Sequence, residues 1–486
     1  MNYLDMTIKE LHEALVQKKV TPLELVKEAL KRAHEDDNNA FETIMDDYAL
    51  NMASMLKEPE AENLFWGIPF VIKDNISTKG VLTTASSNIL KDYVPLFDAT
   101  VVTKLLEKKA IPIAKSTLDE LAMGGTGTTG HLGKTYNPYD KSHTRMVGGS
   151  SCGSAASVAA SIVPFALGSD TGDSVRKPAS LAGLVGMKPT WGRISRFGLF
   201  PFAPSLDHIG YFTRSVFDSA ALLSALSGRD DNDSTSSTRP VEDYTRLLDT
   251  PIEGKKIAVI DEIISSLTNE EIVRKFNETL DILKNKGAII VHEHIPTRIL
   301  ETLYPTYMVI SCAEVTSNNA NLDGIKFGPR FGGNTYQEVM RAARTEGFGE
   351  LIKRRFVIGS FALMRENQEE LFLRAQKNRH LIVDIVNDIL SRNDVIYVPA
   401  APTVAPKFSD VSDKLSEEYL IADNHLVLGN FAGLPSITIP VGFIDNLPFG
   451  ANFMGKAFNE AEVFQIAKAL ENELGYYNIS AKKVTL

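Results

Sequence analysis

Short apolar runs alternate with polar turns along this chain, and the spacing within the runs predicts both helices and strands. Thr7–Glu10 and Thr21–Glu24 are capping-box patterns, and leucines at helical spacing follow both, so we expect two helices there. A third capping box at Thr268–Glu271 predicts a helix to about Lys284. Further helices are expected at 99–108 and 459–474 and over most of 300–376, and strands at 67–72, 110–114, 255–260, 288–292, 395–398, 436–441 and 450–455.

The order of these elements indicates an α/β protein. The strand, helix and strand between 255 and 292 follow the pattern of a parallel βαβ unit. The other strands are spread over the whole chain, without a clear linker or an internal repeat. We therefore expect a large mixed β-sheet core flanked by α-helices on both faces, with a surface loop at Gly228–Thr238.

Composition narrows the class of protein. The 486 residues carry 51 Lys and Arg against 61 Asp and Glu, a net charge of −10, and no run of basic residues exceeds three. A surface that grips nucleic acid normally shows a basic stripe, so strong binding by this chain alone is not expected. Two cysteines and nine scattered histidines, without C-x-x-C or H-E-x-x-H, predict neither a disulfide framework nor a metal site. The chain shows no signal core and no spanning apolar run, which predicts a cytoplasmic protein.

The segment from Gly148 to Thr190 carries the strongest chemical signal. Ser150 and Ser174 each lie in a turn rich in Gly and Ser, and an apolar stretch of small residues separates them. Such turns expose backbone N–H groups, so a serine there can act as a nucleophile while neighbouring N–H groups stabilise an oxyanion. A flexible linker would lack the buried-type runs SVAAS and VPFALG, and no phosphate-loop motif is present. The segment therefore predicts a buried, preorganised reaction centre.

A serine nucleophile needs a base, and the sequence offers two kinds. His143 and His208 are the histidines nearest to the segment, but neither lies in a nucleophile–base pattern. Lys73 follows a predicted buried strand, and burial could lower its pKa from about 10.4 far enough for it to act as a base. Taken alone, Lys73 is better explained as a surface lysine at the end of a strand.

Several long motifs together resemble the amidase signature family. They are GIPFVIKDN, DELAMGGTG, GGSSCGSAAS, LGSDTGDSVRKPAS and GLVGMKPTWGRISRFGLFPFAPSLDHIG, and the match covers nearly the whole chain. The resemblance implies the amidase signature fold and a Ser-Ser-Lys triad: Ser174 is the nucleophile, Ser150 a bridging serine held by a cis peptide, and Lys73 the base. It also implies an oxyanion hole made by four consecutive backbone N–H groups, those of Thr171, Gly172, Asp173 and Ser174.

Within this family the chain is most similar to the A subunits of the aspartyl/glutamyl-tRNA amidotransferases. The similarity lies in AEVTSNNANLDGIKFG, RTEGFGELIKRRFVIGSFAL, AQKNRHLIVDI, YVPAAPTVAPKF and NFAGLPSITIPVGF. It implies a glutaminase that supplies ammonia for converting Glu-tRNA(Gln), Asp-tRNA(Asn) or both to the amidated forms. A B subunit would bind the tRNA and activate it with ATP and Mg²⁺, and a small C subunit would wrap the interface. This chain would hold no cofactor.

Free glutamine is a zwitterion, so its site needs one cationic and one anionic group. By the resemblance, Arg355 binds the α-carboxylate and Asp423 receives the α-amino group, although Arg354 could exchange roles with Arg355. Tyr307 would line the same pocket. The backbone of the turn Met123, Gly124 and Gly125 would face the amide.

The chain departs from the family pattern at two positions near the serines. Asp173 and Cys152 stand where the family usually has glycine. A carboxylate aimed at developing negative charge would oppose catalysis, so we predict that the Asp173 side chain points away from the oxyanion hole, onto a backbone N–H or Arg176. Cys152 is expected to be a packed thiol behind Ser150. The turn Gly124–Gly130 is also richer in glycine than the family pattern.

Two further interpretations remain open at this point. One is a stand-alone amidase for another carboxamide, which would have no need of a clamp for a zwitterion. The other is a catalytically silent scaffold, which Asp173 keeps possible. The resemblance also implies a single domain, 1–486. Its parts are an N-terminal helical segment (1–60), a signature core with the catalytic residues (61–230) and the remaining strands with a helical insertion at the substrate pocket (231–486).

Overall fold

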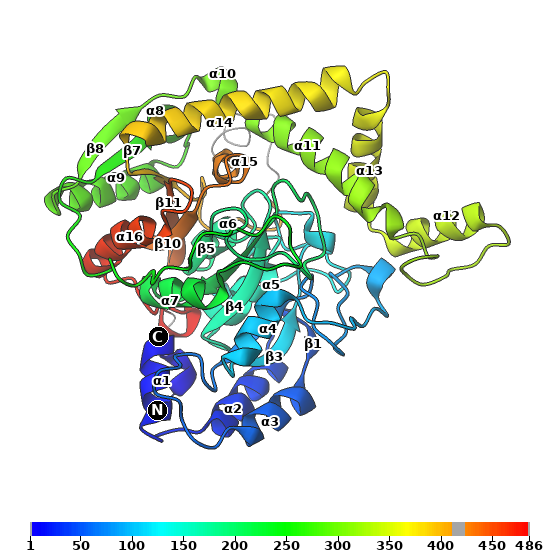
Figure 1. Cartoon of the computed structure of the whole chain (residues 1–486). Helices are drawn as coiled ribbons and strands as arrows, with labels where there is room; N and C mark the ends of the chain where they lie inside the picture. The colour runs from blue at the N-terminus through cyan, green and yellow to red at the C-terminus, as the bar shows by residue number, and fades with distance from the viewer. Residues whose placement is uncertain (1, 411–422, 485–486) are drawn as a thin grey trace.

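A computed structural model of the chain describes residues 2–410 and 423–484. Within them, the strands form one 11-stranded sheet in the order β1-β3-β2-β4-β6-β5-β10-β11-β9-β7-β8 (Figure 1). Strands distant in sequence are therefore neighbours at the centre of the sheet. The strands are β1 (Phe41–Ile44), β2 (Pro69–Lys73), β3 (Ile111–Ser116), β4 (Phe165–Asp170), β5 (Val185–Lys188), β6 (His208–Thr213), β7 (Lys256–Ile260), β8 (Ile289–Glu293), β9 (Val395–Pro399), β10 (Ser436–Ile444) and β11 (Leu447–Gly455).

The sheet is mixed, as predicted. β2 is parallel to both β3 and β4, and β7 is parallel to both β8 and β9. The remaining neighbours pair antiparallel. Because parallel strands end at the same edge, the carboxyl ends of β2 and β4 meet, and this edge carries the catalytic candidates.

Helix starts follow the local capping chemistry. Thr7 and Thr21 each close a full capping box, which confirms the two predicted helices. The third predicted box is wrong in its residue: the helix begins one position later, because the Asn269 side chain accepts the N–H groups of Glu271 and Ile272 in place of Thr268. The helices are α1 (Ile8–Val16), α2 (Pro22–His34), α3 (Asp46–Met55), α4 (Thr100–Glu107), α5 (Cys152–Ala159), α6 (Arg176–Leu181), α7 (Val216–Leu226), α8 (Asp261–Ser265), α9 (Glu270–Asn285), α10 (Thr297–Leu300), α11 (Leu303–Asn318), α12 (Tyr336–Gly347), α13 (Glu350–Leu363), α14 (Arg374–Arg392), α15 (Leu428–Phe431), α16 (Glu460–Leu474) and α17 (Ala481–Val484).

Helices cover both faces of the sheet, and two glycines of β11 show this directly. A Cβ added at Gly450 would lie 3.1 Å from Ser180 of α6, whereas one at Gly455 would lie 2.3 Å from Val463 of α16. These glycines are five positions apart, so they point to opposite faces of the strand. α6 and α16 therefore lie on opposite sides of the sheet.

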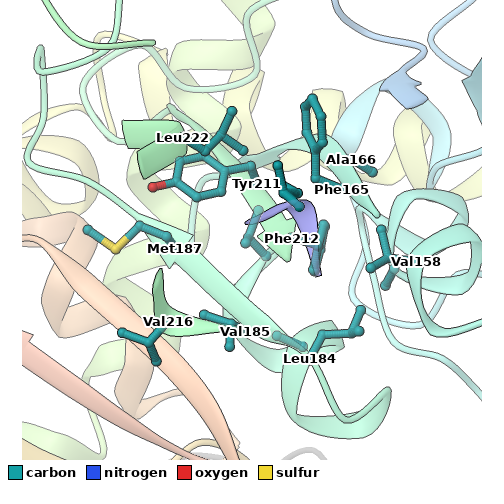
Figure 2. Packing of buried hydrophobic residues seen from close by; sticks show 14 of the residues in the cluster. Val158, Phe165, Ala166, Leu184, Val185, Met187, Tyr211, Phe212, Val216 and Leu222 are labelled. Atoms are coloured by element: carbon teal, nitrogen blue, oxygen red, sulfur yellow. The ribbon is translucent and has the colours of Figure 1, made fainter. Parts of the chain in front are cut away.

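The core of the sheet is densely apolar. Figure 2 shows side chains of β4, β5 and β6 gathered with residues of α5 and α7. Val158, Phe165, Val185, Phe212 and Val216 in this group are all buried. Burial of such side chains supplies the main driving force for folding, and here it fixes β4, which ends at the site.

A second helical layer covers the site edge of the sheet. α11 packs against α13 and α14, and Figure 1 shows α11–α14 on the opposite side of the molecule from α1–α3. Its apolar cluster includes Met123, Phe202 and Phe356.

The two ends of the described chain also meet, because Asn478 Nδ2 and Lys483 Nζ both donate to the Asp5 carbonyl oxygen at 3.0 Å.

Candidate active site

Lys73 is the last residue of β2, and its amine lies in a cage of serine oxygens. Nζ is 2.8 Å from Ser150 Oγ and 2.9 Å from both Ser151 Oγ and Ser169 Oγ. It also lies 3.3 Å from the Ser169 carbonyl oxygen. The side chain is fully buried. The surface-lysine interpretation is therefore wrong, because β2 ends against β4 inside the molecule.

Burial lowers the pKa of the Lys73 amine to about 7, although the Cys152 and Asp119 side chains oppose the shift. A neutral amine has two N–H groups and one lone pair. The Ser151 hydroxyl donates to the Ser169 carbonyl oxygen at 3.1 Å, whereas the Ser150 hydroxyl has no partner but Lys73 in the described part of the chain. Ser150 is thus placed to pass its proton to the lysine lone pair.

The loops that carry Ser150 and Ser174 are joined through the main chain. The Gly149–Ser150 peptide is cis, as the resemblance implied. The Ser151 N–H donates to the Ser174 carbonyl oxygen at 3.2 Å, which brings Ser174 next to Ser150. No hydrogen bond joins the two hydroxyl groups within the described ranges. In enzymes without substrate such bonds are often long and tighten in the substrate complex.

In the loop 171–174, hydrogen bonds hold carbonyl groups, whereas the N–H groups have no acceptor in the described part of the chain. The Gly172 carbonyl oxygen accepts from Arg176 Nη2 at 2.8 Å, and that of Ser174 accepts from Ser151. Among residues 2–410 and 423–484, none accepts a hydrogen bond from the four N–H groups of this loop. Buried N–H groups are rarely left without an acceptor. A row of such donors beside Ser174 is suited to bind an oxyanion.

A buried ion pair holds this loop in place. Arg176 Nε and Nη2 bind the two Asp170 carboxylate oxygens at 3.1 and 2.9 Å. Arg176 also donates to the Leu426 carbonyl oxygen and to Asn430 Oδ1, at 2.7 and 2.6 Å. Despite burial, Arg176 holds the pKa of Asp170 well below its usual range. The guanidinium therefore ties the end of β4 to the segment before β10.

The Asp173 carboxylate binds Lys177, and the predicted contact with Arg176 is wrong because Asp170 occupies that guanidinium. Lys177 Nζ lies 2.6 Å from Asp173 Oδ2 and 3.0 Å from Asp423 Oδ1. It also donates to the Asp423 carbonyl oxygen at 2.8 Å. Burial alone would lower the pKa of Lys177, but the two carboxylates raise it above its ordinary value. Sequence reasoning missed Lys177, although its position four residues after Asp173, where the chain enters α6, was a usable signal.

Asp119 organises the predicted amide-facing turn and was also missed. Its carboxylate accepts the backbone N–H groups of the four residues 126–129, at 2.9 to 3.2 Å. A Cβ at Gly124 would lie 2.4 Å from Asp119 Cγ, so only glycine fits there. A Cβ at Gly125, in contrast, would have no atom of the described residues within 4 Å. Met123 is fully buried. An acid just before a Gly/Thr-rich turn was the available signal.

Tyr307 and Arg355 lie together at the loop 171–174, which we call the oxyanion loop. A Cβ at Gly172 would be 3.2 Å from the Tyr307 ring, and that ring meets Phe202 edge-on with centroids 6.4 Å apart. The Arg355 guanidinium lies 5.3 Å from the Phe202 ring centroid, and its Nε and Nη1 are buried without a hydrogen-bond partner among the described residues. Arg354, in contrast, is exposed and bound to Glu350. The inward side chain is therefore Arg355.

Phe202 and Thr171 are both anchored by Asp207, which lies in the segment SLDHIG but was not predicted as a site residue. Its carboxylate accepts the Thr171 hydroxyl at 2.7 Å and the Phe202 N–H at 2.9 Å.

Cys152 is 1% exposed, and burial raises the pKa of its thiol to about 12. It is therefore a packed thiol, as predicted.

The comparisons with known proteins agree with this geometry. Residues 24–464 match the family model described as Amidase. The chain belongs to the amidase family. The A subunit of glutamyl-tRNA(Gln) amidotransferase from Fusobacterium nucleatum is 42% identical, with 98% of each chain covered. The protein of the same name from Halothermothrix orenii is 40% identical over the full length of both chains.

Solved structures of amidase-family enzymes share the fold. The A subunit of the Thermotoga maritima glutamyl-tRNA(Gln) amidotransferase superimposes with a TM-score of 0.78 at 38% identity, covering 97% of this chain and 95% of its own. A peptide amidase from Stenotrophomonas maltophilia gives 0.80 at 26% identity, covering 97% of each. The amidase signature fold is thereby confirmed. Across the described ranges, no helix of this amidase is long and apolar enough to cross a membrane.

Proposed function

We propose that this amidase is the glutaminase component of a tRNA-dependent amidotransferase. The observation that carries the proposal is the buried Lys73 amine, hydrogen-bonded to Ser150 in a loop that is tied to Ser174. Relatives of the same length, about 40% identical, are named as A subunits of glutamyl-tRNA(Gln) amidotransferase. The family membership supports amide hydrolysis, and the relatives' name supports glutamine as the amide.

The proposed chemistry begins with neutral Lys73, which accepts the Ser150 proton as Ser150 accepts that of Ser174. Ser174 Oγ bonds to the amide carbon, and the carbonyl electron pair moves to an oxygen held by the N–H groups of 171–174. Breaking the C–N bond sends the proton held by Lys73 to the leaving nitrogen, which releases ammonia and leaves an ester on Ser174. Water then attacks the ester, and the same groups move its proton, so that glutamate and free Ser174 are formed.

A pair of oppositely charged residues, Arg355 and Asp423, supports glutamine as the substrate over an amide without charged groups. Arg355 is proposed to bind the α-carboxylate, since two of its nitrogens lack a partner among the described residues, and Asp423 to bind the α-amino group. Tyr307 would form the wall between the clamp and the oxyanion loop. The backbone of Met123, Gly124 and Gly125 is proposed to face the amide.

The ammonia is proposed to pass to a B subunit, which binds the aminoacyl-tRNA and activates it with ATP and Mg²⁺. A small C subunit would wrap the interface between the two. The relatives are named as one subunit of an amidotransferase, which supports a complex of several chains. Two buried free cysteines fit a reducing compartment, which supports a cytoplasmic location.

The direct test measures ammonia release from glutamine by the purified chain, with and without candidate B and C subunits. Weak release alone and faster release in the complex are expected, because an acyl-enzyme formed without an acceptor for ammonia wastes glutamine. Cleavage of other carboxamides without any action on glutamine would instead favour a stand-alone amidase, whose fold the peptide amidase already represents. A chain that cleaves no amide would be a scaffold.

A matched pair of substitutions tests the carboxylate clamp. Arg355→Met is expected to raise KM for glutamine by roughly 10–100-fold, the size of a lost charge-assisted hydrogen bond. Arg354→Met, one residue earlier on α13 and exposed, should leave KM within about threefold, since a surface ion pair contributes little. Steady-state ammonia release checks both variants. A larger effect at Arg354 would show that the two arginines exchange roles.

A further inference from the structure

Lys177 of α6 is a buried cation that touches two different parts of the site. One contact is the Asp173 carboxylate at 2.6 Å, and the other is the Asp423 carboxylate at 3.0 Å. Its third contact is the Asp423 carbonyl oxygen at 2.8 Å. An ammonium group has three N–H donors, so these three acceptors account for all of them.

The two carboxylates have different places in the proposed reaction. Asp173 immediately precedes the nucleophile Ser174, and its own N–H is one of the four oxyanion donors. Asp423 is the proposed acceptor of the substrate α-amino group, more than 240 residues later in the chain. Lys177 therefore joins the oxyanion loop to the ammonium subsite through one side chain.

Charge decides what this link does. An unpaired carboxylate beside the oxyanion would repel the negative charge that develops on the carbonyl oxygen. The Asp173 side chain is only 18% exposed, so water screens this repulsion less than it would on the surface. Burial raises the pKa of Asp173, while the nearby Lys177 opposes that shift. With Lys177 charged, the group of three carries one net negative charge, which still favours an incoming ammonium group.

Lys177 also sets the orientation of Asp423. A carboxylate has two oxygens and can accept several donors, and Lys177 takes Oδ1 and the backbone oxygen of the same residue. Both bonds act on one residue, so they restrain its main chain and its side chain together. A substrate ammonium group then meets a carboxylate that is already positioned.

We propose that Lys177 is a positioning residue for glutamine hydrolysis. It neutralises Asp173 beside the oxyanion loop, and it fixes Asp423 for the substrate ammonium group. The assignment of Asp423 rests on the proposed function. The neutralisation of Asp173 does not, because it concerns any amide that Ser174 attacks. The two parts predict different kinetic effects. Loss of the neutralisation of Asp173 should lower kcat, and loss of the fixed position of Asp423 should raise KM.

The test uses the full chain in its complex, with Lys177→Met, Asp173→Gly and the double variant. Lys177→Met is expected to lower kcat about 10–100-fold and to raise KM for glutamine about 10-fold. Adding Asp173→Gly should return kcat to within about threefold of wild type, because the carboxylate that Lys177 neutralised is then absent. KM should stay raised, because Asp423 still lacks the two contacts with Lys177 that hold it in position. Lys177→Arg should retain more activity than Lys177→Met, since it keeps the charge.

Glutaramate, which is glutamine without its α-amino group, separates the two parts. Its KM should change less than threefold in Lys177→Met, while its kcat should fall as for glutamine. Lys177→Gln serves as a second variant if Lys177→Met does not fold, as judged by the Tm. The proposal is overturned if a folded Lys177 variant keeps kcat and KM within twofold, or if Asp173→Gly fails to restore kcat. If wild type does not hydrolyse glutamine at all, the proposed function fails instead, and the kcat comparison is made on a carboxamide that it cleaves.

Discussion

Replacing Ser174 with alanine is expected to reduce kcat for glutamine hydrolysis by about 10⁴-fold or more. The alanine variant has no atom that can form the acyl ester, whereas the N–H groups of 171–174 and the proposed clamp of Arg355 and Asp423 stay in place. KM should therefore change little. Ammonia release under saturating glutamine measures the loss, and a covalent glutamyl adduct should be absent from the variant by mass spectrometry.

Ser157→Ala is the matched control for this substitution. Ser157 is a buried serine of α5, and its hydroxyl donates to the Ser154 carbonyl oxygen at 2.9 Å, away from Lys73. Its loss should cost about 1 kcal/mol of unfolding free energy and leave kcat within about twofold. Equal kcat for Ser174→Ala and Ser157→Ala would show that Ser174 is not the nucleophile.

Replacing Lys73 with methionine is expected to lower kcat by about 10³-fold or more, because Ser150 then has no acceptor for its proton. Wild-type kcat/KM should rise with pH and level off above an apparent pKa near 7. The sign follows from the lysine: its pKa is lowered to about 7, so the neutral base predominates above that pH and is lost below it. A pH–rate profile of both proteins checks this, and the rise should vanish in the variant.

Lys115→Met distinguishes the loss of a base from the loss of any buried lysine. Lys115 lies one strand away on β3, fully buried, with its Nζ 3.1 Å from Asp74 Oδ1. Removing it leaves that carboxylate unpaired and should lower stability by roughly 3–5 kcal/mol. The folded fraction should keep the rise in activity near pH 7. A rise near pH 7 that persists in Lys73→Met would exclude Lys73 as the base.

Local sequence rules predicted much of the fold, because helix caps and apolar runs act over a few residues. The boxes at Thr7 and Thr21 and the apolar strands β2, β3 and β9 are of this kind. β1 and β6 were not predicted, since half of the residues in FETI and in HIGYFT are polar or glycine. Their strand conformation comes from the neighbours they pair with, β3 for β1 and β4 and β5 for β6.

The site was predictable only where motifs carried it. The resemblance named Lys73, and the structure shows the burial that its chemistry requires. The apolar run before residue 73 predicted a buried strand, but it did not decide whether the lysine at its end is buried too. The partner of Asp173 was not predictable in the same way. Two candidates, Arg176 and Lys177, lie at helical distance, and the choice between them depends on Asp170 having already bound Arg176.

The anchorage of Arg176 has a consequence for the newly made protein. Leu426, whose carbonyl oxygen holds Arg176, follows it by 250 residues, and β10, which pairs with β5, is made still later. A ribosome has therefore translated the nucleophile long before it adds the residues that shape the loop around it. Such distant closure slows folding. A nascent or truncated chain that ends before Leu426 would lack the carbonyl oxygen of Leu426 and the side chain of Asn430, which both hold Arg176. We therefore expect the loop that carries Ser174 to be unshaped in such a chain, which amide hydrolysis by a truncated variant would test.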